Sequence, residues 1–469
     1  MKKEFTDKEL NEKVSELYHL YKDNDIVLLK LNNYINIQLP KLLINENDKL
    51  KERNERMILL NKNKNDFILK FLSKNHYLYI NSTELFILYD NFSYNIINED
   101  DIQYNILSSI SNLGGNITQW KFKIKNEILS KIKNNNISNT IPESNTIQNT
   151  IQILFPFILK SKDEVKYFLT YIGDIILKKD NIPFIFINIK FKNIINELCK
   201  QIYFYTLTSI DSYFKYKFSE QYSNKLRILN CNKDLCTNNE QLTSNTLNNL
   251  KNNILNIIFV SCYYSNRFQN SDLFLIDKCE SNINYNILFL KNNNTDEIIE
   301  LFLNKFVIKT DNSLNSISYK NMLFLWNSFL EQQDLPKIIC DKTLKTKLIN
   351  KLNFKDDLFQ SVLSNYLKNI DSFLSFFNDN FYENKNEINF ELEEIYHLYK
   401  NWLNKQKKSK SKDMNYYEIN ETKIFNIINY YFNNCMFENE KYLINFSTNL
   451  WNKKDEIKSF LSNNDISML

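Results

Sequence analysis

The chain has 469 residues, of which 43% are hydrophobic and 14% aromatic, so it carries enough apolar material for several folded cores and is not a disordered protein. Its 59 basic and 55 acidic residues give a formal net charge of +4, a balance too mild to indicate nucleic-acid binding by itself. With three glycines and three histidines, the chain has almost none of the residues from which phosphate loops, dinucleotide loops, nucleophile elbows and histidine-centred hydrolases are built.

The N-terminal part of the chain is predicted to be a mostly helical domain over residues 1–136. Its first 60 residues have helical spacing. HYLYI from His76 and LFILYD from Leu85 are aromatic and β-prone, with the polar NST between them, and predict a short hairpin. A helix over residues 100–111 should end at Gly114, because glycine readily adopts the positive φ that ends helices.

A central α/β domain is predicted over residues 137–313. Residues 160–179 have the spacing of an amphipathic helix, and Gly173 lies in its middle. Glycine costs about 1 kcal/mol there relative to alanine, so we expect another element to pack closely against it. The apolar runs IPFIFINI, residues 182–189, and ILNIIFVSCYY, residues 254–264, predict buried strands.

The C-terminal part, residues 314–469, is predicted to be helical and winged-helix-like. Helix, basic turn, helix and strand follow one another there, which is the order expected of a winged-helix module. The predicted helices cover residues 317–332, 343–351, 356–377, 390–408 and 424–432, and a strand begins at Lys441. The expected fold class is therefore α+β, predominantly helical, with short buried strands in the central domain and this module at the end.

Cysteine usage and apolar stretches predict an intracellular protein without a membrane anchor. The seven cysteines are odd in number and form no CxxC, which is typical of free thiols in a reducing compartment. The start, MKKEFTDKEL, lacks the apolar core of a secretory signal, and the longest apolar stretches reach about half the length of a membrane span. We expect neither a metal nor a cofactor.

Two segments that alternate lysine with aromatic residues and one lysine-rich run are the candidate nucleic-acid contacts, because aromatic side chains can stack bases and lysines can neutralise phosphates. Two of them, WKFKIK and YFKYKF, can equally be elements with one face in a core, and a third, lysine-rich run can equally be a solvated linker. The candidates are Trp120, Lys121, Lys123 and Lys125; Lys215 and Lys217; and Lys405, Lys407, Lys408, Lys410 and Lys412.

A further candidate is Arg267, one of only four arginines in the chain. It lies in SNRFQNSD, a polar stretch that directly follows the second apolar run. Binding groups collect where the strands of α/β sheets end, and a guanidinium can hold a phosphate or carboxylate through two hydrogen bonds. A salt bridge between Arg267 and Asp272 that only shapes the loop is the alternative.

Four stretches between residues 141 and 336 resemble a largely uncharacterised protein group of mimivirus-like large cytoplasmic DNA viruses: IPESNTIQNTI, KYFLTYIGDIILKK, SCYYSNRFQNSD and ISYKNMLFLWNSFLEQQDLP. YFLTYIGDIIL and IYHLYKNWL are also similar to the helicase and C-terminal regions of poxvirus-type and phage primase–helicases. That resemblance implies a helicase-like core, but IPFIFINI is followed by KFKN without glycine, and ILNIIFV lacks an acidic pair for magnesium. The ATPase activity of those enzymes therefore does not transfer.

Three hypotheses about function follow. The first is a non-catalytic, nucleic-acid-associated protein of a viral replication or transcription apparatus, in the host cytoplasm (viral factory) or the virion. The second is a structural or assembly protein, a virion or scaffold component that binds viral proteins or further copies of itself. The third is an enzyme of unfamiliar type centred on Arg267 and Asp272, for which no Walker A motif, dinucleotide loop, triad or metal site is recognisable.

Overall fold

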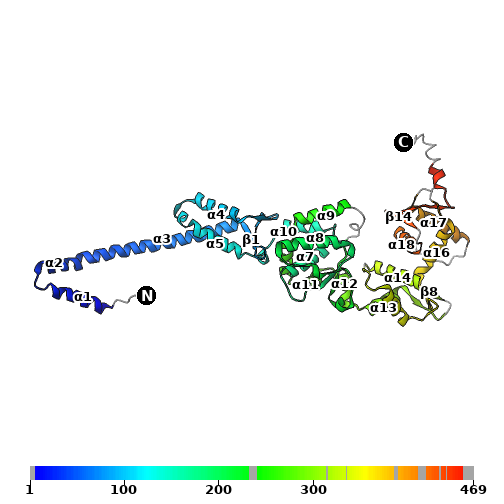
Figure 1. The fold of residues 1–469 in the computed structure, drawn as a ribbon, viewed down its shortest axis with the longest axis horizontal. Coiled ribbons are helices and arrows are strands. Elements are labelled where there is room, and N and C mark those ends of the chain that lie inside the picture. Colours follow the sequence, from blue (N-terminus) through cyan, green and yellow to red (C-terminus); the bar gives the residue numbers. More distant parts are fainter. Residues whose placement is uncertain are drawn as a thin grey trace, which may run out of the picture.

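The computed structural model describes residues 6–231, 240–312, 315–333, 335–384, 389–409, 419–432, 435–439 and 441–457. The described chain is a predominantly helical α+β protein, as its sequence predicts. It is elongated: a helical arm projects from a row of globular units, and the C-terminal unit lies at the other end (Figure 1). No helix in this part of the chain combines the length and the apolarity of a membrane span.

The arm begins with α1 (Asp7–Leu20) and α2 (Asp25–Asn33), whose N-cap Asn24 accepts a hydrogen bond from a backbone N–H of its first turn. A π-helical turn, η1 (Tyr34–Gln38), then leads into α3 (Leu39–Lys74). The backbone keeps right-handed helical angles at both junctions, so residues 25–74 form one uninterrupted helix. Pro40 near the start of α3 has no N–H to donate, which places the irregular turn just before it.

The N-terminal globular unit packs two helices and a small sheet on the end of α3. The strands β1 (His76–Ile80), β2 (Leu85–Tyr89) and β3 (Tyr94–Ile97) form an antiparallel meander, which confirms the predicted hairpin. The helices α4 (Glu99–Leu113) and α5 (Lys121–Lys133) supply isoleucines to a core that also takes Phe67 and Phe71 from α3. Gly114, at φ +62°, ends α4 as predicted.

The central unit contains a three-stranded parallel sheet in the order β5-β4-β6. Its strands are β4 (Phe184–Phe186), β5 (Phe214–Lys215) and β6 (Leu226–Ile228), of which β4 was predicted. The helices are α6 (Ser144–Leu154), α7 (Lys162–Ile176), α8 (Lys192–Thr206), α9 (Glu240–Asn252), α10 (Ile254–Phe268), α11 (Ser271–Lys278) and α12 (Ser281–Asn292). Here α7 and α10 pack closely along their lengths.

The second predicted strand of this unit is wrong, because ILNIIFVSCYY is most of α10. Eleven residues of α10 are buried, so its sequence is apolar almost without interruption and lacks the polar face that identifies most helices. SNRFQNSD is likewise not a polar loop that follows a strand. Its first half completes α10, Gln269 turns the chain at φ +66°, and Asn270 caps α11 by accepting from the Leu273 N–H at 2.8 Å.

The C-terminal unit surrounds the largest apolar cluster, which also takes side chains from β4 and β6 of the central sheet. Its helices are α13 (Thr295–Phe306), α14 (Tyr319–Gln332), α15 (Asp341–Lys351), α16 (Asn365–Asn380), α17 (Leu392–Ser409) and α18 (Glu421–Tyr431). The single helix predicted over residues 356–377 is wrong in its first part, where the short strands β10 (Leu358–Gln360) and β11 (Val362–Leu363) precede α16.

The remaining strands of this unit are β7 (Ile308–Lys309), β8 (Ser316–Ser318), β9 (Phe354–Lys355), β12 (Phe381–Glu383), β13 (Phe390–Glu391), β14 (Met436–Glu438), β15 (Tyr442–Ile444) and β16 (Phe446–Thr448). Among these, β13, β15 and β14 form an antiparallel sheet in that order, next to α17 and α18. The strand predicted from Lys441 is thus confirmed as β15 and β16.

Candidate functional site

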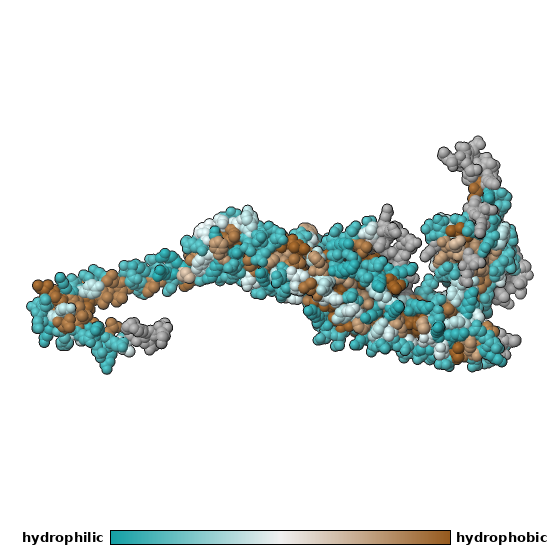
Figure 2. Space-filling view, viewed as in Figure 1, coloured by the Kyte–Doolittle hydropathy of each residue, from teal (hydrophilic) through white to brown (hydrophobic). Residues whose placement is uncertain are grey.

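The helical arm, residues 7–66, is the part of the described chain that the globular units leave uncovered. No side chain of α1, α2 or η1 is buried, and the first buried side chain of α3 is Phe67. Apolar side chains nevertheless recur along the arm and are exposed, from Leu10 in α1 to Leu59 in α3. Figure 2 shows them as brown patches along the arm and at its distal end. Exposed apolar surface of this extent is typical of a protein-binding site.

On α3 part of this apolar surface belongs to an ordered stripe, whereas Leu42, Ile44, Ile58 and Leu59 lie outside it. Ten positions alternate at spacings of four and three residues, the spacing of a coiled-coil seam. They are Leu39, Leu43, Glu46, Leu50, Arg53, Met57, Leu60, Lys64, Phe67 and Phe71. The last three are covered: both phenylalanines lie in the N-terminal core, and Lys64 donates to Glu127 Oε2 of α5 at 2.8 Å. The other seven we call the open seam.

The open seam continues the covered face of α3 out into solvent. Its side chains Leu39, Leu43, Leu50 and Met57 are between 38% and 60% exposed, and Leu60 is half-buried. This face of the helix has coiled-coil spacing, and it is buried at one end but exposed over three further heptads. The exposed part therefore lacks the packing partner that such a face normally has. A second helix laid along the open seam would bury these side chains as α5 and the sheet bury the phenylalanines.

Charges of both signs are equally frequent on the arm. Residues 7–66 contain eleven Lys and Arg and eleven Asp and Glu. Lys49 lies 2.7 Å from Glu46, and Arg56 lies 3.0 Å from Glu52. The hydrogen bond from Lys49, and then its charge, lower the pKa of Glu46, so this carboxylate is ionised at neutral pH. An arm without net charge does not attract a nucleic-acid backbone, and mixed charges beside an apolar stripe favour a protein partner.

The predicted basic segment around Trp120 lies at the surface of the N-terminal unit. Trp120 ends the 3-10 helix η2 (Gly115–Trp120) and packs partly against the core. Lys121, Lys123 and Lys125 lie in the first turns of α5. Lys123 Nζ is 4.7 Å from the centre of the Trp120 ring, and Lys125 donates to Gln103 Oε1 at 3.1 Å. The ring expected to stack a base is thus covered by a lysine of its own chain.

The second predicted segment lies at the edge of the central sheet. Lys215, at the end of β5, donates to the backbone carbonyl of Ser212 at 2.8 Å, and its Nζ lies 4.6 Å from the centre of the Phe184 ring. Lys217 is exposed. The lysine of this pair that faces the sheet therefore holds a turn and covers an aromatic ring.

The third predicted segment is described only in part. Lys405 is exposed near the end of α17, and Lys407 and Lys408 also belong to this helix. The side chains of Lys407 and Lys408 lie outside the described residues, as do Lys410 and Lys412 altogether. Helices α5 and α17 lie at opposite ends of the row of globular units (Figure 1), so the predicted basic residues are distributed along the molecule.

The salt bridge between Arg267 and Asp272, which was the alternative to a binding role for Arg267, does not form, because each side chain has another partner. Asp272, in the first turn of α11, accepts hydrogen bonds from Arg227 Nε at 2.9 Å and from Arg227 Nη2 at 2.7 Å. Arg267 instead donates to the hydroxyl of Tyr263 at 3.2 Å, within α10. The fold therefore does not join Arg267 and Asp272 into one centre, and Arg227 on β6 is the arginine that holds the carboxylate.

The Arg227–Asp272 pair is largely enclosed, because Arg227 is only 4% exposed. Burial by itself raises the pKa of Asp272, but the hydrogen bonds and the charge of Arg227 outweigh burial and hold that pKa below its ordinary value. The hydroxyl of Tyr167, on α7, is buried and has no hydrogen-bond partner among the described residues. Burial, and next the charge of Asp272, hold its pKa well above the ordinary value. A closed ion pair and a neutral phenol indicate a structural role.

A second buried carboxylate joins α7 to α10 and α11. Asp174 accepts hydrogen bonds from the Ser265 hydroxyl at 2.6 Å and from the Ser271 backbone N–H at 2.7 Å. Lys179 Nζ lies 3.3 Å from the same carboxylate and donates to the Ser265 carbonyl at 2.7 Å. These partners all belong to the protein, so the cluster fixes three helices and offers no free ligand position.

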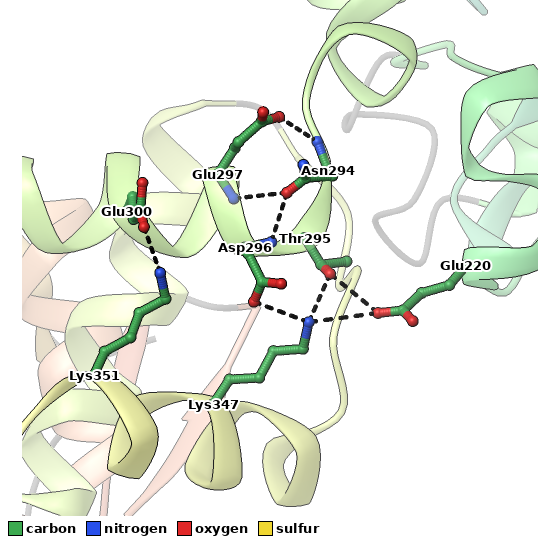
Figure 3. Close-up of polar contacts among 8 residues, drawn as sticks. All are labelled: Glu220, Asn294, Thr295, Asp296, Glu297, Glu300, Lys347 and Lys351. Atoms are coloured by element: carbon green, nitrogen blue, oxygen red, sulfur yellow. Dashed lines mark hydrogen bonds and ion pairs between the residues drawn. The ribbon is translucent and has the colours of Figure 1, made fainter.

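Polar side chains also fix the joint between the central and C-terminal units. Lys347 of α15 donates to the Thr295 hydroxyl at 2.8 Å and to Asp296 Oδ1 at 3.1 Å, and its Nζ lies 3.7 Å from Glu220 of the central unit (Figure 3). The Thr295 hydroxyl also donates to Glu220 at 3.0 Å. One lysine thus connects α15, the start of α13 and the central unit, and the acidic side chains around it are neutralised internally.

A cavity of about 270 Å³ lies between α14, α16 and the start of α18. Apolar side chains make up much of its wall, and Asn426 of α18 donates to Glu331 of α14 at 2.9 Å at its rim. Its volume lies just below the range of about 300–1,000 Å³ that is usual for ligand pockets. The hydroxyls of Tyr430 and Tyr431 donate to the Lys320 carbonyl and to Asn321 Oδ1, both at 2.9 Å, and so hold α18 against α14.

Comparison of the chain with protein-family models, with curated proteins and with solved structures gave no match. Function must therefore be inferred from the molecule itself. Of the surfaces described above, the open seam differs from the others, because the polar clusters of the globular units are paired within the chain and the seam is bare.

Proposed function

We propose that this protein is a non-catalytic assembly protein that uses its helical arm to bind another helical surface. The observation that carries the proposal is the open seam. It belongs to a stripe with coiled-coil spacing whose C-terminal end is buried in the N-terminal core and whose remaining length is exposed to solvent. Helices gain most of their stability in water from packing an apolar face, so a long bare arm is suited to a bound state. Of the hypotheses that the sequence raises, this geometry supports the structural one best.

In-cell photo-crosslinking tests this function. A benzophenone amino acid placed at Leu50, in the open seam, should form a covalent adduct with a protein when cells that express the chain are irradiated. The matched control is the same amino acid at Glu55, which is exposed on the same helix but lies outside the seam. Adduct at position 50 and none at 55 supports the proposal. Absence of adduct at both positions, or equal adduct at both, contradicts it.

A second candidate function is nucleic-acid association through the C-terminal unit. Apart from β12, which follows α16 and pairs with β16, the elements α16, β13, α17, α18, β14 and β15 follow one another in the order expected of a winged-helix module, with β15 between the other two strands of its sheet. In such a module α18 would be the recognition helix, but its tyrosines are held on α14. The phosphates of the nucleic acid would then be contacted by two exposed lysines, Lys423 at the start of α18 and Lys405 on α17.

This second candidate predicts salt-sensitive binding to DNA or RNA that depends on those two lysines. The double variant Lys405→Glu/Lys423→Glu should lower the affinity and reduce the slope of log affinity against log salt by about two, one for each lost phosphate contact. Lys30→Glu, on the arm, is the matched control and should leave the slope unchanged. Fluorescence anisotropy with labelled single- and double-stranded oligonucleotides measures both quantities, and a wild-type chain that binds none of them rejects the candidate.

A further inference from the structure

We propose that the partner of the open seam is a second copy of this chain, bound antiparallel, so that two arms pair along residues 39–60. This inference rests on the proposed assembly function and names its partner. The open seam spans three heptads, and at a rise of 1.5 Å per residue it is about 33 Å long. Antiparallel pairing about its midpoint lays Leu39 of each copy near Leu60 of the other, so the two open seams cover each other over their whole length.

The charges on one arm can pair with the charges on the arm of a second copy. Residues 46–56 hold four acidic and four basic side chains in a segment of eleven. In an antiparallel pair, this segment of one copy would lie beside the same segment of the other copy, which runs in the opposite direction. Each of the two segments carries equal numbers of positive and negative side chains. A partner with a strongly acidic or basic helix would gain nothing from a surface without net charge, whereas a second copy matches it.

The two charged positions within the seam decide the orientation. Glu46 and Arg53 interrupt the apolar stripe, and polar residues at seam positions set register and direction in coiled coils. A parallel pair in register would place Glu46 against Glu46 and Arg53 against Arg53. Antiparallel pairing about the midpoint of the seam, with Leu39 opposite Leu60, places Glu46 of each copy level with Arg53 of the other, twice in every dimer because of the two-fold axis.

The covered end of the stripe favours the same orientation. At Lys64 the face of α3 is already occupied by α5 of the same chain, through the bond to Glu127. In a parallel pair both globular bodies would lie at the same end of the arms, and each α5 would compete with the second arm for this space. Antiparallel pairing puts the two bodies at opposite ends, about 50 Å apart if each begins near Phe67.

Sedimentation velocity of the full chain tests self-association. We expect a monomer–dimer equilibrium with a dissociation constant in the micromolar range, because two of the seven seam positions are charged. The double variant Leu43→Glu/Met57→Glu should leave a monomer whose helix content is unchanged, since both side chains are exposed. A wild-type chain that remains monomeric up to about 100 µM overturns the inference.

Charge reversal tests the orientation. Glu46→Arg sets a second guanidinium beside Arg53 of the other copy and should weaken the dimer about tenfold or more; Arg53→Glu, which sets two carboxylates side by side, should do the same. The double reversal Glu46→Arg/Arg53→Glu restores opposite charges and should return the dissociation constant to within about threefold of wild type. Glu55→Arg makes the same charge change outside the seam and should have no effect. Single reversals without effect, or a double reversal no better than the singles, overturn antiparallel pairing.

The crosslinker at Leu50 separates failure of this inference from failure of the proposed function. In cells that express two differently tagged versions of the chain, an adduct that carries both tags supports self-pairing. An adduct with a different protein, and none with both tags, overturns self-pairing but leaves the assembly function standing. No adduct at Leu50 rejects the assembly function itself.

Discussion

Alanine in place of Gly173 is expected to destabilise the central unit by about 2–3 kcal/mol, although the same change inside an ordinary helix stabilises it by about 1 kcal/mol. A Cβ on Gly173 would lie 2.1 Å from the carbonyl oxygen of Ser261 and 2.7 Å from the Cβ of Ser265, both on α10. The nearest atom belongs to the backbone, so no side-chain rotation relieves the clash. The two helices would have to move apart, which would break the hydrogen bonds that the Ser265 hydroxyl and the Ser271 N–H donate to Asp174.

Hydrogen–deuterium exchange of peptides from α7 and α10 measures this effect locally. Tryptophan fluorescence would miss it, because the four tryptophans lie at positions 120, 326, 402 and 451, outside the central unit. Gly115→Ala is the matched control: Gly115 has φ +74° and no atom within 4 Å of an added Cβ. It should cost only the backbone strain, about 1 kcal/mol. Equal protection of α7 in both variants would contradict a packing role for Gly173.

Close packing at Gly173 could be predicted from the sequence because glycine is so scarce. The chain has three glycines, and a mid-helix glycine in such a composition has no local advantage that explains it. The hairpin β1–β2 could also be predicted, because its two β-prone runs and the polar turn between them are signals within a short segment. These features need only a few neighbouring residues to be recognised.

Features that depend on distant partners could not be predicted. The apolar run of α10 was interpreted as a strand because a helix buried on every side has no polar face to show its period. A salt bridge of Asp272 with Arg267, five residues away, was one alternative considered from the sequence, but the partner of Asp272 is Arg227, 45 residues away on β6. Which side chains meet across such a separation is decided by how β6 and α11 pack.

The open seam was missed for a different reason. Its spacing of four and three is present in the sequence, but Glu46 and Arg53 interrupt it, and the sequence analysis predicted only that the segment is helical. The same spacing is buried at Phe71 and exposed at Leu43, so the pattern alone does not show where a partner is missing. The structure supplies that difference because it shows where the globular unit ends.

Replacing Arg227 with methionine is expected to destabilise the central unit by about 3 kcal/mol, because it leaves Asp272 charged and mostly enclosed. The side chain of Asp272 is 29% exposed, and Lys291, whose Nζ lies 3.7 Å away, remains as a partly exposed partner. The carbonyls of Asn224 and Leu226 also lose the hydrogen bonds that Arg227 Nη1 donates. Exchange rates of β6 and α11 peptides measure the loss, and wild-type protection in this variant would contradict it.

The pH dependence of the variant should be opposite to that of the wild type. In the wild type the folded pKa of Asp272 is depressed, so the pair stabilises the fold above the ordinary carboxyl pKa of about 3.9 and this stability is lost as the pH falls through the folded value. Without Arg227, burial, which is the largest single influence on this carboxyl, is opposed only by Lys291, so we expect the folded pKa of Asp272 to rise above the ordinary value. The variant should then gain stability as the pH falls from about 7 towards 4, which urea unfolding at several pH values measures.

Removing both charges should cost less than removing one. In the double variant Arg227→Met/Asp272→Leu no charge remains enclosed, and replacement of a buried ion pair by apolar side chains of similar size is often close to neutral. We therefore expect the double variant to be more stable than Arg227→Met alone by about 1–3 kcal/mol, so that the losses of the two single variants are not additive in the double-mutant cycle. Additive losses would show that Asp272 is not what makes Arg227→Met costly. A double variant near wild type would instead show that the pair adds little net stability to the central unit, and that the cost of Arg227→Met comes from the unpaired charge it leaves on Asp272.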